Sequence, residues 1–203
     1  MTKVFIGGSR RISRLDAEVK RRIDRMIEKR MPVIVGDANG ADKAVQEYLR
    51  TKDYDLVEVF CSGDACRNNR GGWPTRAVHV PRSGKRKDFS FYATKDRAMA
   101  EEATVGLMLW DSESVGTVMN VLRLIQRHKK VVVYVAPKHE FVDVKSENDW
   151  ERFLAHCEAP LKDRVAKESV AELGDGAEHS DAQANLPAPV DGVRARTRSS
   201  RRS

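Results

Sequence analysis

The stretch that decides the fold is residues 106–122, GLMLWDSESVGTVMNVL. Its apolar run stops at Asp111, a short polar loop follows, and apolar residues then recur at helical spacing from Val118 onward. A strand that leads through small residues into a helix directs backbone N–H groups and the positive end of the helix dipole towards an anion. The stretch therefore predicts one wall of a phosphate-type site, with an ordinary strand-to-helix turn as the alternative.

The rest of the chain repeats this pattern of a buried strand followed by a helix. Short apolar runs predict strands at 3–6, 33–35, 56–61, 107–110 and 131–135, and helical spacing predicts helices at 13–27, 44–49, 89–103, 118–125 and 146–157. Ser13 is expected to cap the first helix in a capping box with Asp16. The alternation predicts an α/β fold, a Rossmann-like three-layer sandwich with a mainly parallel sheet of about five or more strands. Ligands of such sheets bind beyond the carboxyl ends of the strands.

Composition and charge narrow the class of protein. Of the 203 residues, 40% are hydrophobic and 33% are charged, which suits one well-buried domain with some chain left over. No apolar run approaches the roughly 20 residues that a membrane span requires, and the chain enters its first strand without a signal-peptide pattern. We therefore expect a cytoplasmic protein with no membrane partner. The net charge is +7, and five arginines among the last twelve residues supply most of it.

The pattern divides the chain into a domain over residues 1–160 and a tail over 161–203. The tail decays into Ala, Glu, Asp, Ser and Pro before its Arg-rich end, and this composition predicts disorder. Within the domain, residues 62–88 are expected to form a long polar loop, and loops of this length are usually functional or mobile. Trp73 in this loop could stack on a base or anchor the loop in the core.

The three cysteines predict no disulfide framework. Cys61, Cys66 and Cys157 are odd in number and lack CxxC spacing, so we expect reduced thiols rather than a disulfide or a zinc site. The histidines are scattered without metal-ligand spacing, and no metal site is predicted.

The end of the first strand offers Gly7, Gly8, Ser9 and Arg10 as ligand-binding candidates. Two glycines let the backbone approach a ligand, the Ser9 hydroxyl can donate a hydrogen bond, and Arg10 can pair with phosphate or carboxylate. The motif is not GxGxxG, so a dinucleotide fingerprint is not supported. A plain turn with a surface arginine is the alternative.

The second strand end and the third predicted helix add acidic and basic candidates. Asp37 is placed to contact a hydroxyl or a ribose, Gly40 belongs to the same loop, and Asp42 could bind ligand or stabilise the start of the next helix. Lys95 and Asp96, with Arg97 beside them, are candidates for the pocket rim. A solvent-facing charge cluster is the alternative for all three.

In the loop after residues 107–110, we predict that Asp111, Ser114, Gly116 and Thr117 bind ligand. Gly116 removes side-chain bulk, and the two hydroxyls supplement the backbone N–H groups as anion donors. Asn120 could reach the ligand or pack within the fold. Asp111 and Glu113 are the candidates for catalysis, because they are the carboxylates of this loop.

Four motifs in this order, GGSR, GDANGAD, KDRAM and WDSESVGT, resemble the YspA-like (cpYpsA-related) branch of the SLOG superfamily. That superfamily contains Rossmann-like proteins related to the DNA-processing protein DprA and to the LOG phosphoribohydrolases. The resemblance covers roughly residues 1–136. It implies a fold that binds a nucleotide or nucleotide-derived ligand at the strand ends. It departs from the LOG motif PGGxGTxxE at Asn120, which stands where those enzymes carry a glutamate, and an amide cannot act as general base or nucleophile.

Three functional hypotheses follow. The preferred one is a sensor or nucleotide-processing protein that binds an ADP-ribose- or NAD-like molecule or a nucleoside phosphate, with no cofactor certain. The first alternative is an N-glycosidic hydrolase of nucleoside monophosphates. The second is DprA-like nucleic-acid binding through the basic tail, which Asp37 and Asp42 disfavour because they would repel a polyanion. A homodimer is expected only by analogy with the fold.

Overall fold

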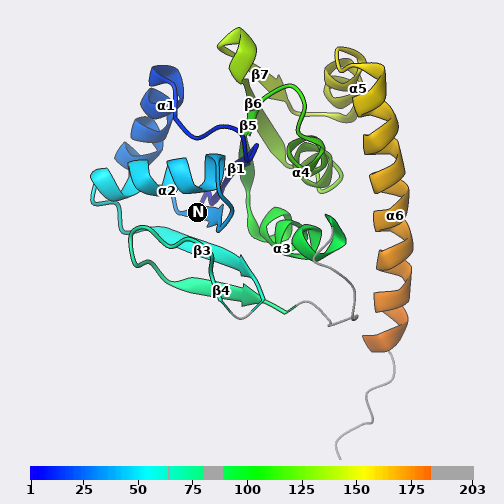
Figure 1. The fold of residues 1–203 in the computed structure, drawn as a ribbon, viewed down its shortest axis with the longest axis horizontal. Coiled ribbons are helices and arrows are strands. Elements are labelled where there is room, and N and C mark those ends of the chain that lie inside the picture. The colour runs from blue at the N-terminus through cyan, green and yellow to red at the C-terminus, as the bar shows by residue number, and fades with distance from the viewer. Residues whose placement is uncertain (64, 80–88, 184–203) are drawn as a thin grey trace, which may run out of the picture. The chain divides into compact units, whose positions relative to one another are not determined.

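The computed structural model describes residues 1–63, 65–79 and 89–183, and in that part of the chain seven strands form one sheet. The strand order is β4-β3-β2-β1-β5-β6-β7 (Figure 1). The strands are β1 (Val4–Gly8), β2 (Val33–Gly36), β3 (Val57–Ser62), β4 (Thr75–Val78), β5 (Val105–Trp110), β6 (Lys130–Val135) and β7 (Glu140–Val144). The first six pair in parallel, and β7 runs antiparallel to β6.

Helices cover both faces of the sheet and bury its alternating side chains. On one face, α1 (Ala17–Glu28) and α2 (Ala41–Thr51) pack over Val4 and Ile6. On the other, Phe5 packs with α3 (Phe89–Glu102), α4 (Val115–Ile125), α5 (Glu147–Ala155) and the first turns of α6 (Ala159–Gln183). A short 3-10 helix, η1 (Ala136–Lys138), joins β6 to β7. The predicted Rossmann-like α/β sandwich is therefore confirmed.

The strand order reverses direction at β1, and this reversal positions the site. From β1 the chain builds outward through β2, β3 and β4, then returns to add β5 on the other side of β1. Gly8 and Leu109 are register partners, and the Ser9 N–H donates to the Leu109 carbonyl at 2.9 Å. β1 and β5 therefore end at the same level of the sheet, and the loops that follow them diverge from there. This divergence leaves a crevice at the carboxyl ends of the two strands.

Two edge strands escaped the sequence prediction. β4 lies inside the segment predicted to be a long loop, and β7 was not predicted at all. β4 lies at one edge of the sheet with mostly exposed side chains. β7 lies at the other edge and alternates exposed acids with partly or fully buried apolar residues.

The first helix begins later than predicted. Its N-cap is Asp16 and its first residue is Ala17, whereas Ser13 is exposed and caps nothing. The predicted capping box is therefore wrong. The Asp16 carboxylate instead accepts a hydrogen bond from the hydroxyl of Tyr134 on β6.

The C-terminal boundary also differs. Residues Met1–Glu168 form one compact unit, and the chain from Ser169 is a second. Disorder was predicted from residue 161, but α6 is helical to Gln183, and its first turns bury Leu161 and Val165, at i, i+4 spacing, against the core. The Arg-rich end of the tail, for which disorder was also predicted, lies outside the described residues.

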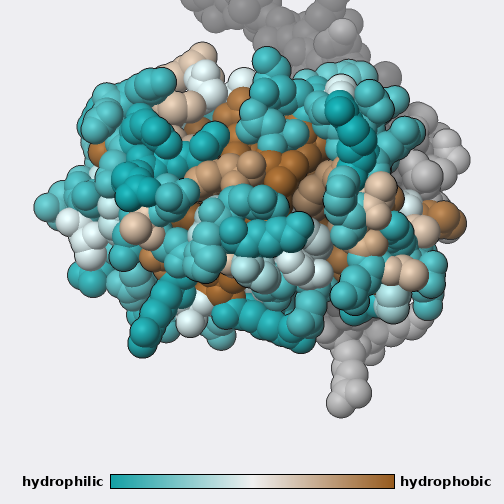
Figure 2. All heavy atoms as spheres, turned by 90° about the horizontal axis from the view of Figure 1, so that it is seen from above, coloured by the Kyte–Doolittle hydropathy of each residue, from teal (hydrophilic) through white to brown (hydrophobic). Residues whose placement is uncertain are grey.

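The surface of the described residues is predominantly polar. Figure 2 shows one face on which hydrophilic residues surround a central apolar area. Among the described large hydrophobic residues, only Met1 and Val170 are mostly exposed. No helix in the described ranges has both the length and the apolar character needed to cross a bilayer.

Candidate functional site

A pocket of about 550 Å³ opens in the crevice beyond the carboxyl ends of β1 and β5. Most residues that the sequence predicted to bind ligand meet there. After β1 and on α2 these are Gly7, Gly8, Ser9, Arg10 and Asp42. On α3 and around the start of α4 they are Lys95, Asp96, Asp111, Ser114, Gly116, Thr117 and Asn120, with Glu113 at the rim. The sheet topology thus gathers segments that are more than one hundred residues apart in the sequence.

Asp37 does not line this pocket. Its side chain is fully buried, and Arg67 holds both carboxylate oxygens, with Nη2 to Oδ1 at 2.6 Å and Nε to Oδ2 at 3.0 Å. The Arg67 backbone N–H adds a third hydrogen bond at 3.1 Å. Burial opposes ionisation, but the hydrogen bonds from Arg67 outweigh it and lower the Asp37 pKa. The prediction that Asp37 contacts the sugar is therefore wrong for this geometry.

Gly40 also lies outside the pocket and has a backbone role. It is the N-cap of α2 and has a φ of 83°, a conformation that favours glycine. A Cβ at this position would collide with the backbone of Arg10. Gly40 therefore lets the loops that follow β1 and β2 pack together.

Ser9 and Asp111 hold the two loops in place. The Ser9 hydroxyl donates to Asp111 Oδ2 at 2.6 Å and accepts the Arg11 N–H at 3.1 Å. Asp111 Oδ1 accepts the N–H groups of Glu113 at 3.1 Å and Ser114 at 2.8 Å. Burial raises the Asp111 pKa, but these hydrogen bonds, led by that of Ser9, lower it overall. The Ser9 hydroxyl, which was predicted to donate to a ligand, thus donates to Asp111 within the protein.

The first turn of α4 presents unused N–H groups to the pocket. Ser114 is its N-cap, and the Ser114 hydroxyl oxygen accepts from Thr117 N at 3.3 Å and from Thr117 Oγ1 at 2.9 Å. Among the described residues, the N–H groups of Val115 and Gly116 have no hydrogen-bond partner, and both residues line the pocket. Together with the positive end of the helix dipole they form an anion-binding corner.

Two arginines and a tyrosine line a further part of the pocket. The Arg10 guanidinium lies 4.6 Å from the centre of the Tyr92 ring, and that of Arg67 lies 4.8 Å from it. Arg11 and Arg164 also line the pocket. The sequence prediction missed Tyr92, although an aromatic residue three positions before Lys95 is a usable signal for a stacking surface.

The pocket floor is a buried charge cluster around Lys95, which is 3% exposed. Its ammonium group lies 3.2 Å from Asp96 Oδ1, 3.8 Å from Asp42 Oδ2 and 3.9 Å from Asp37 Oδ1. Burial lowers the Lys95 pKa, but the three carboxylates, led by Asp96, raise it overall. A Cβ on Gly36 would collide with both Asp42 and Lys95, so glycine is required at the end of β2.

Asn120 is part of a buried polar network. Its Nδ2 donates to Asp96 Oδ2 at 3.2 Å, and its Oδ1 accepts from Arg123. Arg123 is 1% exposed and was not predicted, because it lies within an apolar helical pattern. Asn120 therefore bridges α3 and α4 at the pocket wall.

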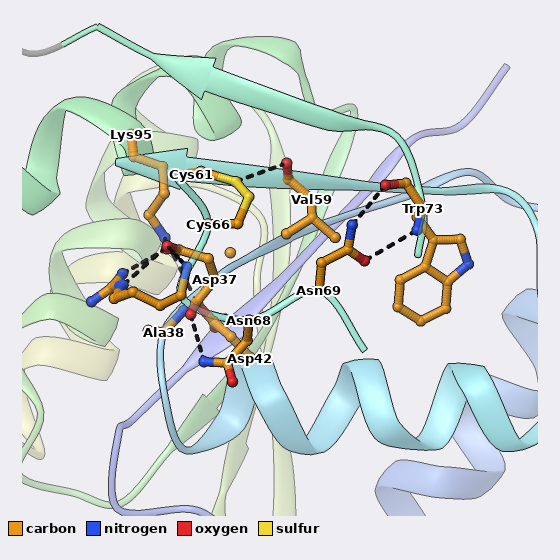
Figure 3. Close-up of a disulfide and its surroundings, with 12 residues drawn as sticks. Asp37, Ala38, Asp42, Val59, Cys61, Cys66, Asn68, Asn69, Trp73 and Lys95 are labelled. Atoms are coloured by element: carbon orange, nitrogen blue, oxygen red, sulfur yellow. Dashed lines mark hydrogen bonds and ion pairs between the residues drawn. A yellow bond between two sulfur atoms is a disulfide. The ribbon is translucent and has the colours of Figure 1, made fainter. Parts of the chain in front are cut away.

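In the segment after β3, the structure differs from the prediction in the oxidation state of two cysteines. Cys61 and Cys66 form a disulfide with a Cα–Cα distance of 4.9 Å, so the prediction of reduced thiols is wrong for this pair (Figure 3). Cys157 is free and buried. Trp73 is 8% exposed and donates from Nε1 to the Tyr54 carbonyl at 2.8 Å, so it anchors the segment in the core and is not available to stack on a base.

Comparison with known proteins supports the assignment of the fold. No family model and no curated protein matches the chain. A solved structure of DNA processing protein A from Helicobacter pylori, reported for its single-stranded DNA binding mode, superposes with a TM-score of 0.50 at 14% identity. The match covers 65% of this chain and 64% of that chain. At this identity the likeness concerns the arrangement of strands and helices.

Proposed function

We propose that the pocket binds a nucleotide, with a phosphate group at the start of α4. The observation that carries the proposal is the pair of unpartnered N–H groups on Val115 and Gly116, which open into a pocket flanked by Arg10. Helix N-termini bind phosphate because their free N–H groups and the helix dipole both favour negative charge. The likeness to DNA processing protein A also supports the kinship with the SLOG superfamily that the motifs indicate. The YspA-like branch stays a prediction.

Arg10 and Tyr92 supply the remaining recognition chemistry. Arg10 has no carboxylate partner among the described residues and is held only by its contact with the Tyr92 ring. Such exposed contacts are worth about 0.5–1 kcal/mol, so the guanidinium can turn to a phosphate at small cost. The Tyr92 ring, which the Arg67 guanidinium also contacts, lines the same pocket.

The geometry does not favour the hydrolytic alternative. Asp111 accepts hydrogen bonds from Ser9, Glu113 and Ser114, and its lowered pKa leaves it a weak base near neutral pH. The Glu113 side chain pairs with Arg11 at an exposed rim. A general acid or base needs a titratable group that is free to exchange a proton with substrate, and neither carboxylate meets that requirement.

Single-stranded DNA is the second candidate, because the solved structure with the same fold is described as binding it. One backbone phosphate of a DNA strand would occupy the corner at the start of α4, and neighbouring phosphates would contact Arg11 and Arg164, which also line the pocket. A strand that contacts several cations binds with a steep dependence on salt concentration, whereas a single mononucleotide does not.

Isothermal titration with nucleoside monophosphates and with oligothymidylates of increasing length tests both candidates. Nucleotide binding predicts that a monophosphate binds alone and that Arg10→Ala weakens it by roughly tenfold, the effect of losing one charge-assisted hydrogen bond. Arg14→Ala is the matched control, because Arg14 lies in the same loop but does not line the pocket.

The DNA candidate predicts instead an affinity that rises with strand length and falls steeply between 50 and 200 mM salt. If neither ligand class binds, or if Arg10→Ala and Arg14→Ala behave alike, the proposed function is wrong.

A further inference from the structure

The floor of the pocket contains a carboxylate oxygen without a partner. Asp42 is 6% exposed, and its Oδ2 accepts the Ala38 N–H at 3.2 Å and lies 3.8 Å from Lys95 Nζ. Among the described residues, Asp42 Oδ1 makes no hydrogen bond. It lies beside Gly7, where an added Cβ would be 3.8 Å away, and both residues line the pocket.

The neighbouring carboxylates are already satisfied. Both oxygens of Asp37 are held by Arg67. Asp96 pairs through Oδ1 with Lys95 and accepts through Oδ2 from Asn120. Asp42 is therefore the one acid of this cluster that retains an acceptor facing the pocket. A ligand hydroxyl that donates to this oxygen adds a hydrogen bond to a charged group within the pocket and therefore gains affinity.

The charges around Asp42 favour a ligand group that is neutral and donates a hydrogen bond to Oδ1. A cationic group beside Oδ1 would be repelled by the buried Lys95 ammonium, whose position 3.8 Å from Oδ2 leaves it close to the same site. Burial, with smaller contributions from Asp96 and Asp37 opposed by Lys95, raises the pKa of Asp42 to about 6. A hydroxyl suits this group best, because it can donate to the carboxylate and accept from the protonated acid.

We propose that Asp42 Oδ1 binds a ribose hydroxyl of the nucleotide whose phosphate lies at the start of α4. The pocket would then bind a ribonucleotide more tightly than the 2′-deoxy or 3′-deoxy form that lacks the bound hydroxyl. This assignment rests on the proposed function and moves sugar recognition from Asp37 to Asp42. In Rossmann-type sheets an acid near the end of the second strand commonly contacts the ribose, and here Arg67 occupies the acid at that position.

The test compares dissociation constants of AMP, GMP, CMP and UMP with those of their 2′-deoxy and 3′-deoxy counterparts. We expect the wild-type protein to bind the ribonucleotide roughly tenfold more tightly than at least one deoxy form, as expected for loss of a hydrogen bond to a charged group. In Asp42→Ala this ratio should fall to about one. Asp55→Ala, which removes an exposed aspartate outside the pocket, should leave the ratio unchanged.

The outcomes separate the two proposals. Equal wild-type affinities for the ribo and both deoxy forms would overturn sugar recognition while leaving phosphate binding intact, and this comparison needs no variant. A ratio that persists in folded Asp42→Ala would also overturn it. Absence of binding for every monophosphate would instead refute the proposed function on which the assignment rests.

Discussion

The Ser9 hydroxyl donates a 2.6 Å hydrogen bond to the Asp111 carboxylate and thereby joins the ends of β1 and β5 where the strand order reverses. Ser9→Ala would leave Asp111 Oδ2 and the Arg11 N–H without partners, so we expect the free energy of unfolding to fall by about 1–3 kcal/mol. Urea denaturation measures this loss. Ser13→Ala in the same loop should change stability by less than about 0.5 kcal/mol, because Ser13 is exposed and caps no helix. Equal losses in the two variants would contradict this role for Ser9.

Arg67 neutralises a fully buried acid, and its removal should be costly. In Arg67→Ala the Asp37 carboxylate would keep only the more distant Lys95, at 3.9 Å, as a cationic partner. We expect a loss of about 3 kcal/mol, since breaking a buried pair leaves an uncompensated charge. Arg70→Ala is the control, because the Arg70–Glu47 pair is more than a third exposed on each side and is worth under about 1 kcal/mol. A similar loss in both variants would contradict the claim that the buried Arg67–Asp37 pair stabilises the fold more than an exposed ion pair does.

Asp42 should make stability depend on pH in a defined direction. The folded protein holds the Asp42 proton to about pH 6, whereas an ordinary aspartate releases its proton near 3.8. The folded state therefore binds more protons between these values, and the free energy of unfolding falls as pH rises through this interval. From pH 5 to 7.5 the wild-type protein should lose about 1 kcal/mol more than Asp42→Asn. Parallel curves for the two proteins would mean that Asp42 titrates normally.

The Cys61–Cys66 disulfide should be detectable and stabilising. Thiol titration of the unfolded, unreduced chain should find one free thiol, that of Cys157, and three after reduction. The cysteines are five residues apart, and a loop this short stabilises the fold by about 2 kcal/mol in the chain-entropy description. Denaturation with and without reductant measures the difference, and Cys66→Ser should abolish the effect of reductant. Three free thiols before reduction would show that the bond does not form in solution.

The sequence was sufficient to predict the central sheet, because β1, β2, β5 and β6 are buried and read as apolar runs. It was not sufficient for β4, whose residues are mostly exposed. The composition of residues 161–183 indicated disorder, and only burial of Leu161 and Val165 in the folded core reveals why the first turns of α6 are helical.

The candidate pocket was predicted better than its internal contacts. Loops that follow parallel strands must meet at one edge of the sheet, so Arg10 and Gly116 could be placed together from topology. The pairing of Asp37 with Arg67 joins positions thirty residues apart through a loop whose path the sequence does not reveal. A ligand contact was therefore predicted for Asp37, although this side chain is paired with Arg67 within the fold. The position of Tyr92 in the pocket was not predicted.

Phosphate binding at the start of α4 is the central claim, and one backbone N–H can be removed to test it. Val115 is the first residue of α4, a position that favours proline, and Ser114 before it has φ −70° and ψ 107°, which a following proline accepts. Val115→Pro deletes the N–H, and Val115→Ala loses similar packing but keeps it. Circular dichroism would first confirm that both variants are folded.

The most direct measurement is the dissociation constant of a nucleoside monophosphate for Val115→Pro relative to Val115→Ala. We predict binding roughly tenfold weaker in the proline variant, because one hydrogen bond to a charged phosphate is lost. Equal affinities in the two folded variants would contradict the claim that the N-terminus of α4 holds the phosphate.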